Sequence, residues 1–494
     1  MSIFTGLETA RRALMSQQLA LNTTNHNIAN ANTPGFSRQE AVFGTTPAYT
    51  LGYSLAGKAM DMGTGVQIED IRRLRDTFLD FQFRSEVKEE GRWEVRREIL
   101  EKLEVVINEP SEGGLAVVLE GFFDSWQELS QNPESRTVRS VVLQQGIALT
   151  DTLNHLDMQL EQLRQDLNQT LLVHVTEINS LGQQIADLNA QVIRAEARGQ
   201  RANDLRDTRD LLVDKLAKLT GVHTTESENG ALNVVIANRG LVEGTRSITL
   251  DTTGSVEHSN LAPVWSDGQD FHVHSGALKG IEEAREIVET FQANLDTLVD
   301  ELSKAVNGIH AAGYGLDALD LAPEDAYEGR NFFISADEDV PGILPGNIII
   351  NPALIANPDL IAAATDIAEL PGDGSLALKL AQLRHKPIMG GLKSGEGAGD
   401  EGEGALTTTL SDYYNSLVAD LGIRSREAQR MAHNQGIVTG AIERQREMAS
   451  GVSLDEEITD MIRFQHAYNA AARMVTAIDE MLEVLVNRMG IVGR

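Results

Sequence analysis

The sequence predicts a mainly α-helical, elongated, multi-domain protein with short β segments inserted near its middle. Three observations support this fold class: an apolar stripe at each end of the chain, long stretches of helical periodicity between them, and a central stretch in which the period changes to two. Because both ends carry the same kind of stripe, we expect long helices from the two termini to pack together. Such a pairing encloses everything between the ends and gives a rod with side domains.

The first expected helix covers residues 5–31 and is about 40 Å long. Thr5 and Glu8 have the spacing of a capping box at its start, and Pro34 ends it because the residue before a proline disfavours helical conformation. The stripe recurs every seven residues, at Leu7, Leu14, Leu21 and Ile28. A stripe this narrow suits packing against another helix.

The last expected helix covers residues 454–489, after a second capping box formed by Ser453 and Glu456. Its stripe consists of Leu454, Ile458, Met461, Gln465, Tyr468, Ala472, Val475, Ile478, Leu482, Leu485 and Met489. Long helices with so narrow a stripe gain most of their stability from packing. We therefore expect neighbouring copies of the chain to complete both terminal helices. The alternative is a closed coiled coil between the two ends of one chain.

Asparagines cluster near the end of the first helix, at Asn22, Asn25, Asn27, Asn30 and Asn32. Asparagine lowers helix propensity and bonds neighbouring backbone, so this cluster and the following Thr33-Pro34-Gly35 are typical of a helix stop. The same amides could instead bind adjacent subunits through hydrogen bonds. The sequence pattern leaves both interpretations open.

Between the ends, helices are expected at about residues 72–108, 115–130, 134–198, 201–220, 278–311 and 405–448. In the longest of these, leucines alternate steps of four and three, except at Leu163, Leu167 and Leu171, where two steps of four follow each other. Such a stutter locally unwinds a supercoil. The stripes at 149–192 and 284–309 are expected to pack within the chain.

The period changes to two in residues 222–275, where strands are expected at 232–236, 247–250 and 271–274. Short strands are also expected within 36–70 and at 331–334 and 347–350, and residues 395–404 form an acidic, glycine-rich loop. Three units are therefore predicted. A terminal helical assembly domain comprises 1–45 and 450–494, a long-helix rod with short strands comprises 46–221 and 276–449, and a small β domain comprises 222–275.

The charge balance argues against several kinds of partner. The chain has 73 acidic against 42 basic residues and a formal charge of −31, so we expect it to bind neither nucleic acid nor an anionic membrane. Because it contains no cysteine, disulfides, thiolate nucleophiles and cysteine-ligated metals are excluded. We expect no cleavable signal peptide and no membrane span, since neither pattern is present.

No constellation in the sequence predicts catalysis, and we expect a protein that is not an enzyme and has no cofactor or metal. Gly397, Gly399 and Gly402 match a dinucleotide fingerprint by letters only, because they follow no expected strand and lie among acids that would repel a pyrophosphate. His272 and His274 have the spacing of half a metal site. Since nothing places a third ligand near them, an exposed strand face is the favoured interpretation.

The two ends of the chain together resemble one family. Residues 27–38, NIANANTPGFSR, are similar to the N-terminal signature of bacterial flagellar rod, hook and hook-associated proteins. Residues 450–473 are similar to the matching C-terminal signature, and the stretches 275–280 and 351–354 resemble the hook-associated members. The resemblance covers the whole chain in order and is sharpest at the ends.

This resemblance implies a structural, non-catalytic adaptor that joins the hook to the filament at the hook–filament junction. It implies export through the flagellar type III channel, without a cleavable signal peptide, to an extracellular place in the flagellum, where the terminal helices form the inner tube. The implied partners are other copies of the chain in a ring, the hook protein, the second hook–filament junction protein and an export chaperone at the C-terminal helix.

The stripes and the resemblance together predict an assembly interface made of Leu7, Leu14, Leu21, Ile28, Asn27, Asn30, Asn32, Leu454, Ile458, Met461, Gln465, Tyr468, Ala472, Val475, Leu482 and Leu485. Within the family, a hook or distal-rod subunit is the alternative function. Outside it, the alternative is a cytoplasmic coiled-coil interaction protein.

Overall fold

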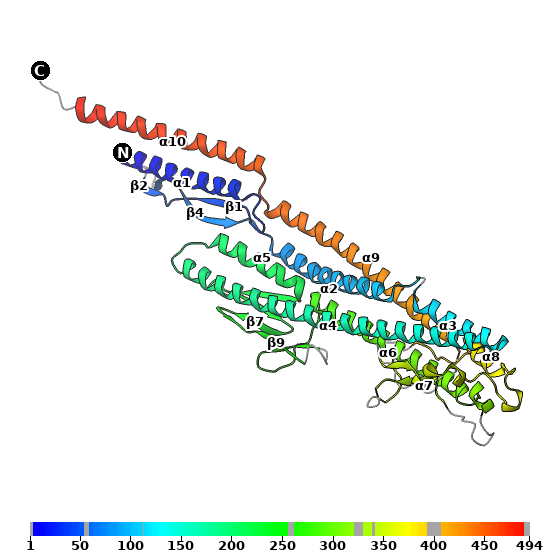
Figure 1. The fold of residues 1–494 in the computed structure, drawn as a ribbon. Helices are drawn as coiled ribbons and strands as arrows, with labels where there is room; N and C mark the ends of the chain where they lie inside the picture. Colours follow the sequence, from blue (N-terminus) through cyan, green and yellow to red (C-terminus); the bar gives the residue numbers. More distant parts are fainter. Residues whose placement is uncertain are drawn as a thin grey trace.

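The computed structural model of the chain describes residues 3–53, 59–111, 113–254, 261–320, 330–337, 341–392 and 407–488. It is an elongated, mainly helical molecule in which helices from the two chain ends lie together at one tip (Figure 1). The terminal helices pack on one another, and small antiparallel sheets are inserted along the chain between the long helices. The predicted fold class is thereby confirmed. The acidic loop at 395–404 and Met489 lie outside the described residues.

The expected helices are present close to their expected positions, and two short helices, at residues 352–356 and 375–382, were not expected. The helices are α1 (Ile3–Asn30), α2 (Thr77–Ile107), α3 (Leu115–Gln131), α4 (Arg136–Glu196), α5 (Asn203–Leu219), α6 (Gly276–His310), α7 (Pro352–Ala356), α8 (Ser375–Gln382), α9 (Leu410–Ser450) and α10 (Leu454–Arg488). The second helix begins later than the expected residue 72, because strand β4 continues to Arg73 and the Asp76 carboxylate then caps α2 by accepting from the Phe78 and Leu79 amides. Ser135 and Thr409 cap α4 and α9 in the same way.

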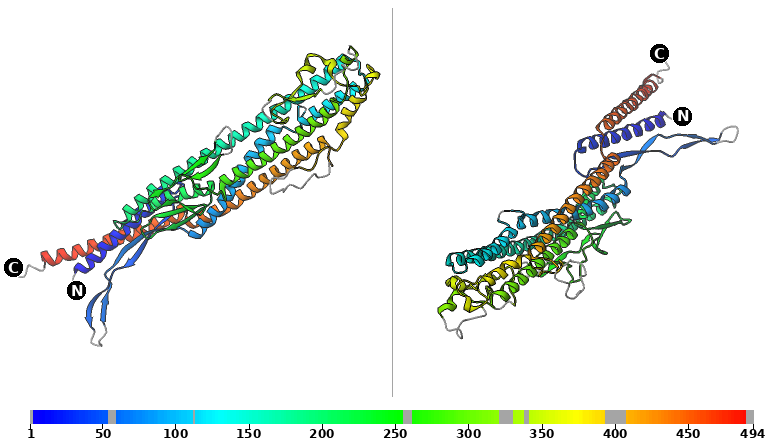
Figure 2. Two further views of the ribbon diagram at one scale, coloured as in Figure 1. Left: turned by 90° about the horizontal axis from the view of Figure 1, so that it is seen from below. Right: turned by 90° about the vertical axis from the view of Figure 1, so that its right-hand side faces the viewer.

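The long inner helices form the rod. α2 packs against α6 and α9, while α4 packs against α3, α5 and α6 (Figure 2). α4 alone contains 61 residues, which corresponds to about 90 Å. The leucines of its stripe are buried in one continuous hydrophobic core that extends through the rod: Leu149, Leu153, Leu156, Leu160, Leu163, Leu167 and Leu171. The expectation that this stripe packs within the chain agrees with this arrangement.

The strands form small antiparallel sheets. β1 (Gln39–Thr45) pairs with β4 (Val66–Arg73), and β2 (Tyr49–Tyr53) pairs with β3 (Ala59–Met62). A four-stranded sheet has the order β5 (Val222–Glu226), β6 (Leu232–Ile236), β7 (Arg239–Glu243), β8 (Arg246–Ser247). The remaining pairs are β9 (Leu250–Thr253) with β10 (Ala262–Trp265) and β11 (Phe333–Ser335) with β12 (Ile348–Ile350). The division into three units stays a prediction. Its boundary between residues 45 and 46 assigns β1 and β4 to different units, although the two strands pair with each other.

Two expected strands differ in the structure. The stretch 247–250 is divided between the end of β8 and the start of β9. Residues 271–274 form no strand, because Phe271 is buried in an edge-to-face contact with Trp265, 5.6 Å between ring centroids, and the chain then leads into α6. His272 and His274 therefore do not share a strand face.

The start of α6 depends on a glycine. Gly276 has a φ of 78°, and a Cβ added there would lie 2.5 Å from the carbonyl oxygen of Leu219. We expect Gly276→Ala to lower the free energy of unfolding by about 2 kcal/mol, because an L side chain is strained at positive φ and would also clash. Gly308→Ala is the matched control in the same helix. No neighbouring atom lies within 4 Å of a Cβ at that position, so this change should stabilise by about 0.5–1 kcal/mol. Urea unfolding midpoints of the two variants measure both effects, and equal shifts would contradict the argument.

At the end of the rod away from the termini, an aromatic cluster surrounds a buried histidine. His310 contacts the rings of Trp126 and Phe332, with centroids 6.2 and 5.5 Å away. Its Nε2 accepts a hydrogen bond from the amide of Ala362 at 3.0 Å, so the proton resides on Nδ1, which donates to the carbonyl oxygen of Arg330 at 2.7 Å. Burial lowers the pKa of His310 to about 4. The imidazole is therefore neutral and has both ring nitrogens hydrogen-bonded.

Candidate assembly interface

The two terminal helices form an antiparallel pair. Gly6 of α1 lies beside Ile478 of α10, while Asn27, near the other end of α1, contacts Glu457 at the start of α10. α1 lies between α10 and the β1–β4 ribbon, and its Ser16 hydroxyl donates to the carbonyl oxygen of Val66 at 3.3 Å (Figure 1). The β2–β3 hairpin projects to one side of this pair (Figure 2). The chain ends thus form a separate tip that extends beyond the rod.

The predicted stripe residues of α1, and some of those of α10, are partly buried in the antiparallel pair that these two helices form. Leu7, Leu14, Leu21 and Ile28 are half-buried, as are Met461, Ala472, Val475 and Leu482. Four predicted residues of α10 remain exposed: Leu454, Ile458, Gln465 and Tyr468. The side chain of Leu485 lies outside the described residues. Neighbouring copies remain the expected cover for the exposed positions.

The polarity of the first turns of α10 is reversed relative to an ordinary surface helix. Leu454, Ile458 and Ile462 lie four residues apart on one line, and their side chains are 49%, 45% and 48% exposed. On the side of the helix that faces the protein, Glu457 is only 2% exposed. A helix of an isolated globular protein buries its apolar line and leaves its charges in water. This arrangement leaves the apolar line of α10 open on the outside of the chain.

Arg38 holds the charged side of α10 inward. Its guanidinium donates to Glu457 at 2.6 Å and to Glu456 at 2.7 Å, and one nitrogen lies 3.5 Å from Asp460. The Arg38 backbone amide also donates to the carbonyl oxygen of Ser450, at the end of α9, at 2.8 Å. Partial burial disfavours the Arg38 charge, but the hydrogen bond that Arg38 donates to Glu457 and the charges of Glu457, Glu456 and Asp460 together outweigh it, so the pKa of Arg38 is raised. Arg38 is therefore charged and ties three segments together.

The asparagines near the end of α1 fall into two groups. Some bond within the chain, as expected for a helix stop, and the side chains of the others are exposed and available to other subunits. Asn27 is buried, and its amide exchanges hydrogen bonds with the backbone of Gln39, at 2.8 and 3.0 Å, and donates to Glu457 at 3.1 Å. Asn30 bonds the backbone oxygen of His26 and the hydroxyl of Thr33, as a helix stop requires. The side chains of Asn22, Asn25 and Asn32 are exposed. Asn27 and Asn30 thus act within the chain, and the exposed amides remain candidates for contacts with other subunits.

An ionic junction connects the terminal tip to the rod. It consists of Arg73, Arg75, Arg84, Arg446, Asp80, Asp207, Asp210 and Asp214, all largely buried. Burial penalises the Asp210 carboxylate, but the surrounding arginines, Arg75 and Arg73 foremost, together outweigh this effect and lower the pKa of Asp210. Arg446 of α9 bonds Asp214 of α5 at 2.6 Å and lies 4.0 Å from the ring centre of Phe83. Because α2, α5, α9 and β4 all contribute, the junction fixes how the tip is attached.

The two terminal sequence signatures meet beside this junction. Residues 31–38, 443, 444 and 446–453 line one open cleft of about 960 Å³, together with Arg75, Leu211 and Asp214. Signatures more than 400 residues apart in the sequence therefore build one local structure.

Among the described residues, no group of three or more histidine, aspartate or glutamate side chains could hold a metal ion. None of the described helices has the length and hydropathy needed to cross a bilayer.

Comparison with known proteins places the chain in a family. Residues 100–333 match the model of the flagellar hook-associated protein FlgK helical domain. Residues 7–36 match the flagella basal body rod protein family, and 445–489 match the C-terminal region of the flagellar basal body rod FlgEFG proteins. The flagellar hook-associated protein 1 of Bacillus subtilis (strain 168) is 33% identical over 533 residues, an alignment that covers 100% of both chains. The chain belongs to the flagellar hook-associated protein 1 family.

A more distant relative agrees with this assignment, and a solved structure has a similar fold. The flagellar hook-associated protein 1 of Escherichia coli (strain K12) is 25% identical, over 97% of this chain and 99% of the relative. The fold is similar to the structure of the flagellar hook junction protein FlgK from Burkholderia pseudomallei, with a TM-score of 0.62, 17% identity, and coverage of 76% of this chain and 100% of that one. The resemblance carried by the terminal motifs is confirmed. The hook-associated chain is thus part of the bacterial flagellum.

Sequence reasoning missed the residues that attach the terminal pair. Arg38 is the last residue of the N-terminal signature and Glu457 follows a capping box, but nothing in the sequence shows that they meet. The ionic junction was also missed, since arginines and aspartates at helical spacing are ordinarily solvated. Ile462 carried a usable signal, because it extends the line of Leu454 and Ile458 by one further step of four residues.

Proposed function

We propose that this hook-associated protein is a structural adaptor that joins hook to filament by assembling through its terminal helices. The reversed polarity of α10 is the observation that supports this function most directly. Leu454, Ile458 and Ile462 form an apolar line that faces away from the chain, and Arg38 holds the opposite, charged side inward. A neighbouring copy, a hook subunit or the second junction protein would each cover this line.

The proposal assigns the chain no catalytic role and no cofactor. According to the proposal, the chain is exported without a cleavable signal peptide to an extracellular site in the flagellum. Before export, a chaperone covers its C-terminal helix. The exposed apolar residues of α10 support the chaperone, because an uncovered line of this kind promotes association in the cytoplasm. The predicted interface residues keep their proposed role, except Asn27 and Asn30, which bond within the chain, and Ile462 joins them.

Deletion of the gene separates this function from its alternatives. Cells without the protein should assemble intact hooks and release unassembled filament subunits into the medium. Cells without hooks would instead indicate a hook or distal-rod subunit. In a filament-defective strain, the protein should accumulate in the culture fluid only when the flagellar exporter is active. Retention in the cytoplasm would favour the coiled-coil interaction protein.

A double substitution tests the apolar line itself. We expect Ile458→Ser with Ile462→Ser to abolish filament attachment, because the partner subunit loses its apolar contact on α10. The stability of the monomer should change by less than about 1 kcal/mol, since both side chains are nearly half exposed. Electron microscopy and motility measure assembly, and urea unfolding measures stability.

Met158→Ser is the matched control for this experiment. Met158 is an exposed apolar residue of α4, 61% accessible, on the rod and outside the terminal helices. This variant should assemble normally. If both variants attach filaments equally well, the apolar line is not an assembly surface.

A further inference from the structure

α10 carries a second exposed apolar stripe, in its C-terminal half. Its five members follow one another in steps of four and three residues, and all are exposed: Ala470, Met474, Ala477, Met481 and Val484. At 3.6 residues per turn, Met481 lies about 140° around the helix from Ile458, which belongs to the apolar line of the first turns. Ile478, which packs towards α1, is only 9% exposed. The helix thus has one side that packs within the chain and two separate apolar sides that do not.

Two methionines give this stripe a reactivity that the apolar line of the first turns lacks. The side chains of Met474 and Met481 are 57% and 55% exposed, so an oxidant in solution reaches them. The chain contains no cysteine, so no thiol of its own consumes the oxidant first. The two methionines lie two helical turns apart, which is about 10 Å along the axis. Their oxidation therefore alters the centre of the stripe.

Hydrogen peroxide converts a methionine thioether to the sulfoxide by transfer of one oxygen atom. The O–O bond breaks and an S–O bond forms, so sulfur is oxidised by two electrons while the peroxide is reduced and leaves as water. The product is a polar side chain in place of an apolar one. A sulfinyl oxygen that is covered without a hydrogen-bond donor loses its hydration, and this loss weakens any contact that covers it.

A second copy of the chain is the partner that fits the two apolar sides of α10. Each copy carries both the second stripe and the line of Leu454, Ile458 and Ile462, so one copy offers the surface that the other needs. In the second stripe, large methionines alternate with small alanines, which leaves gaps that branched side chains fill. Contact between two different sides of the same helix is heterologous, and it therefore joins copies into a ring or a helical tube.

We propose that Met474 and Met481 form an oxidation site that controls this contact between copies. As thioethers they are covered by the next copy, and as sulfoxides they prevent the contact. The inference rests on the proposed assembly through the terminal helices and adds the second stripe and its chemistry. Methionine also suits a surface of this kind, because its flexible side chain adapts to the shape of a partner.

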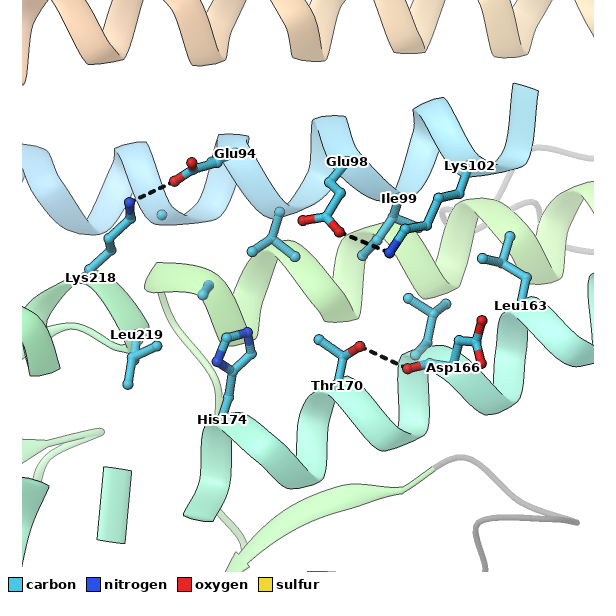
Figure 3. Close-up of a pocket in the computed structure, with 14 residues that line it drawn as sticks. Glu94, Glu98, Ile99, Lys102, Leu163, Asp166, Thr170, His174, Lys218 and Leu219 are labelled. Atoms are coloured by element: carbon cyan, nitrogen blue, oxygen red, sulfur yellow. Dashed lines mark hydrogen bonds and ion pairs between the residues drawn. The ribbon is translucent and has the colours of Figure 1, made fainter. Parts of the chain in front are cut away.

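The same oxidant is expected to leave the rod intact. Its core has a hollow of about 200 Å³ between α2, α4, α5 and the start of α6, but none of the described residues that line this hollow is a methionine (Figure 3). The methionine that belongs to the buried core, Met389, is 1% exposed. Loss of assembly after oxidation therefore comes from the surface of α10 and not from an unfolded rod.

Peroxide treatment of the full-length monomer, followed by peptide mass spectrometry, tests the chemistry of the site. Met474 and Met481 should each gain one oxygen atom at a rate within about threefold of that of Met158, an exposed methionine of the rod. The buried Met389 should react at least about tenfold more slowly. If Met474 and Met481 react as slowly as Met389, the proposal is overturned.

Attachment to hooks tests the consequence of oxidation. The purified chain is added to hooks from cells that lack its gene, and the bound chain is measured by sedimentation. Peroxide should raise the concentration needed for half-saturation at least about tenfold, and methionine sulfoxide reductases should reverse this change. The variant Met474→Leu with Met481→Leu should bind like the natural chain and keep its binding after peroxide, whereas Met158→Leu should stay sensitive. Equal sensitivity of the natural chain and the double variant overturns the proposal, and failure of the untreated chain to bind overturns the proposed function as well.

Cross-linking identifies the partner. Because the natural chain contains no cysteine, a variant with Ile458→Cys and Met481→Cys has only these two thiols. They lie roughly 35 Å apart along one helix, so a short bismaleimide cannot join them within a chain. In flagella of motile cells the reagent should link copy to copy into a ladder on a denaturing gel, and either single variant should give no ladder. Absence of a ladder, or linkage to another flagellar protein instead, overturns the proposal.

Discussion

Replacing Arg38 with alanine is expected to detach the first turns of α10 from α1. Glu457 would remain as a nearly buried carboxylate with only the Asn27 amide as a hydrogen-bond donor. Removing one partner of a buried ion pair costs about 3 kcal/mol or more, because the charge that remains is neither solvated nor paired. Amide hydrogen exchange measures this directly. Protection should fall in α1 and at the start of α10, while the rod, including α4, keeps its protection.

An arginine of α10 itself provides the matched control. Arg463 pairs with Asp460 at 3.0 Å, and its side chain is 67% exposed, so Arg463→Ala should change stability by less than about 1 kcal/mol. Arg38→Lys should fall between the two, since lysine keeps the charge and loses the forked geometry that reaches Glu456 and Glu457 together. Equal protection in the Arg38 and Arg463 alanine variants would show that the buried pair does not hold the terminal helices.

The Arg38 variant also tests how α10 is oriented for assembly. Arg38 keeps Glu457 on the inner side and so turns Leu454 and Ile458 outward. Without this constraint, α10 can rotate and cover its own apolar line against α1. We therefore expect Arg38→Ala to reduce filament attachment although every residue of the apolar line is still present.

The sequence was sufficient for the parts of the fold that depend on local pattern. The leucine stripe of α4 predicted its length and its buried face, because helical periodicity over sixty residues has no other stable solution. The pairing of the two terminal helices followed from their matching stripes.

Features built from distant residues could not be predicted in this way. The α10 stripe was expected to be completed by neighbouring copies, but nothing in its periodicity showed that Leu454 and Ile458 would be exposed at its start while Glu457 is buried. The rotation of the helix is decided there by Arg38, more than 400 residues earlier in the sequence. In the same way, Arg446 and Asp214 lie on helices that meet only after the rod has assembled. Periodicity describes one helix at a time and contains no information about such pairs.

Lowering the pH from 6.5 to 4 is expected to destabilise the end of the rod that contains His310. The folded pKa of about 4 lies below the ordinary value of 6.5, so the unfolded chain binds the proton more readily than the folded one. The stabilisation from neutral His310 is therefore fully present above pH 6.5 and is lost as the pH falls towards 4. At about 1.36 kcal/mol per pKa unit, the loss amounts to about 3 kcal/mol. Urea unfolding, monitored by tryptophan fluorescence across this pH range, measures it.

His310→Gln isolates this contribution. A glutamine amide donates to the Arg330 carbonyl and accepts from the Ala362 amide, as neutral histidine does, but it does not titrate. The variant should lose less stability than the natural chain between pH 6.5 and 4, and other titrating groups, including His174, cancel in the difference. Parallel pH profiles would contradict the assignment. Because protonation must first break the hydrogen bond from Ala362, the expected opening begins where α6 meets residues 361–364 and leaves the terminal pair, at the opposite end of the molecule, in place.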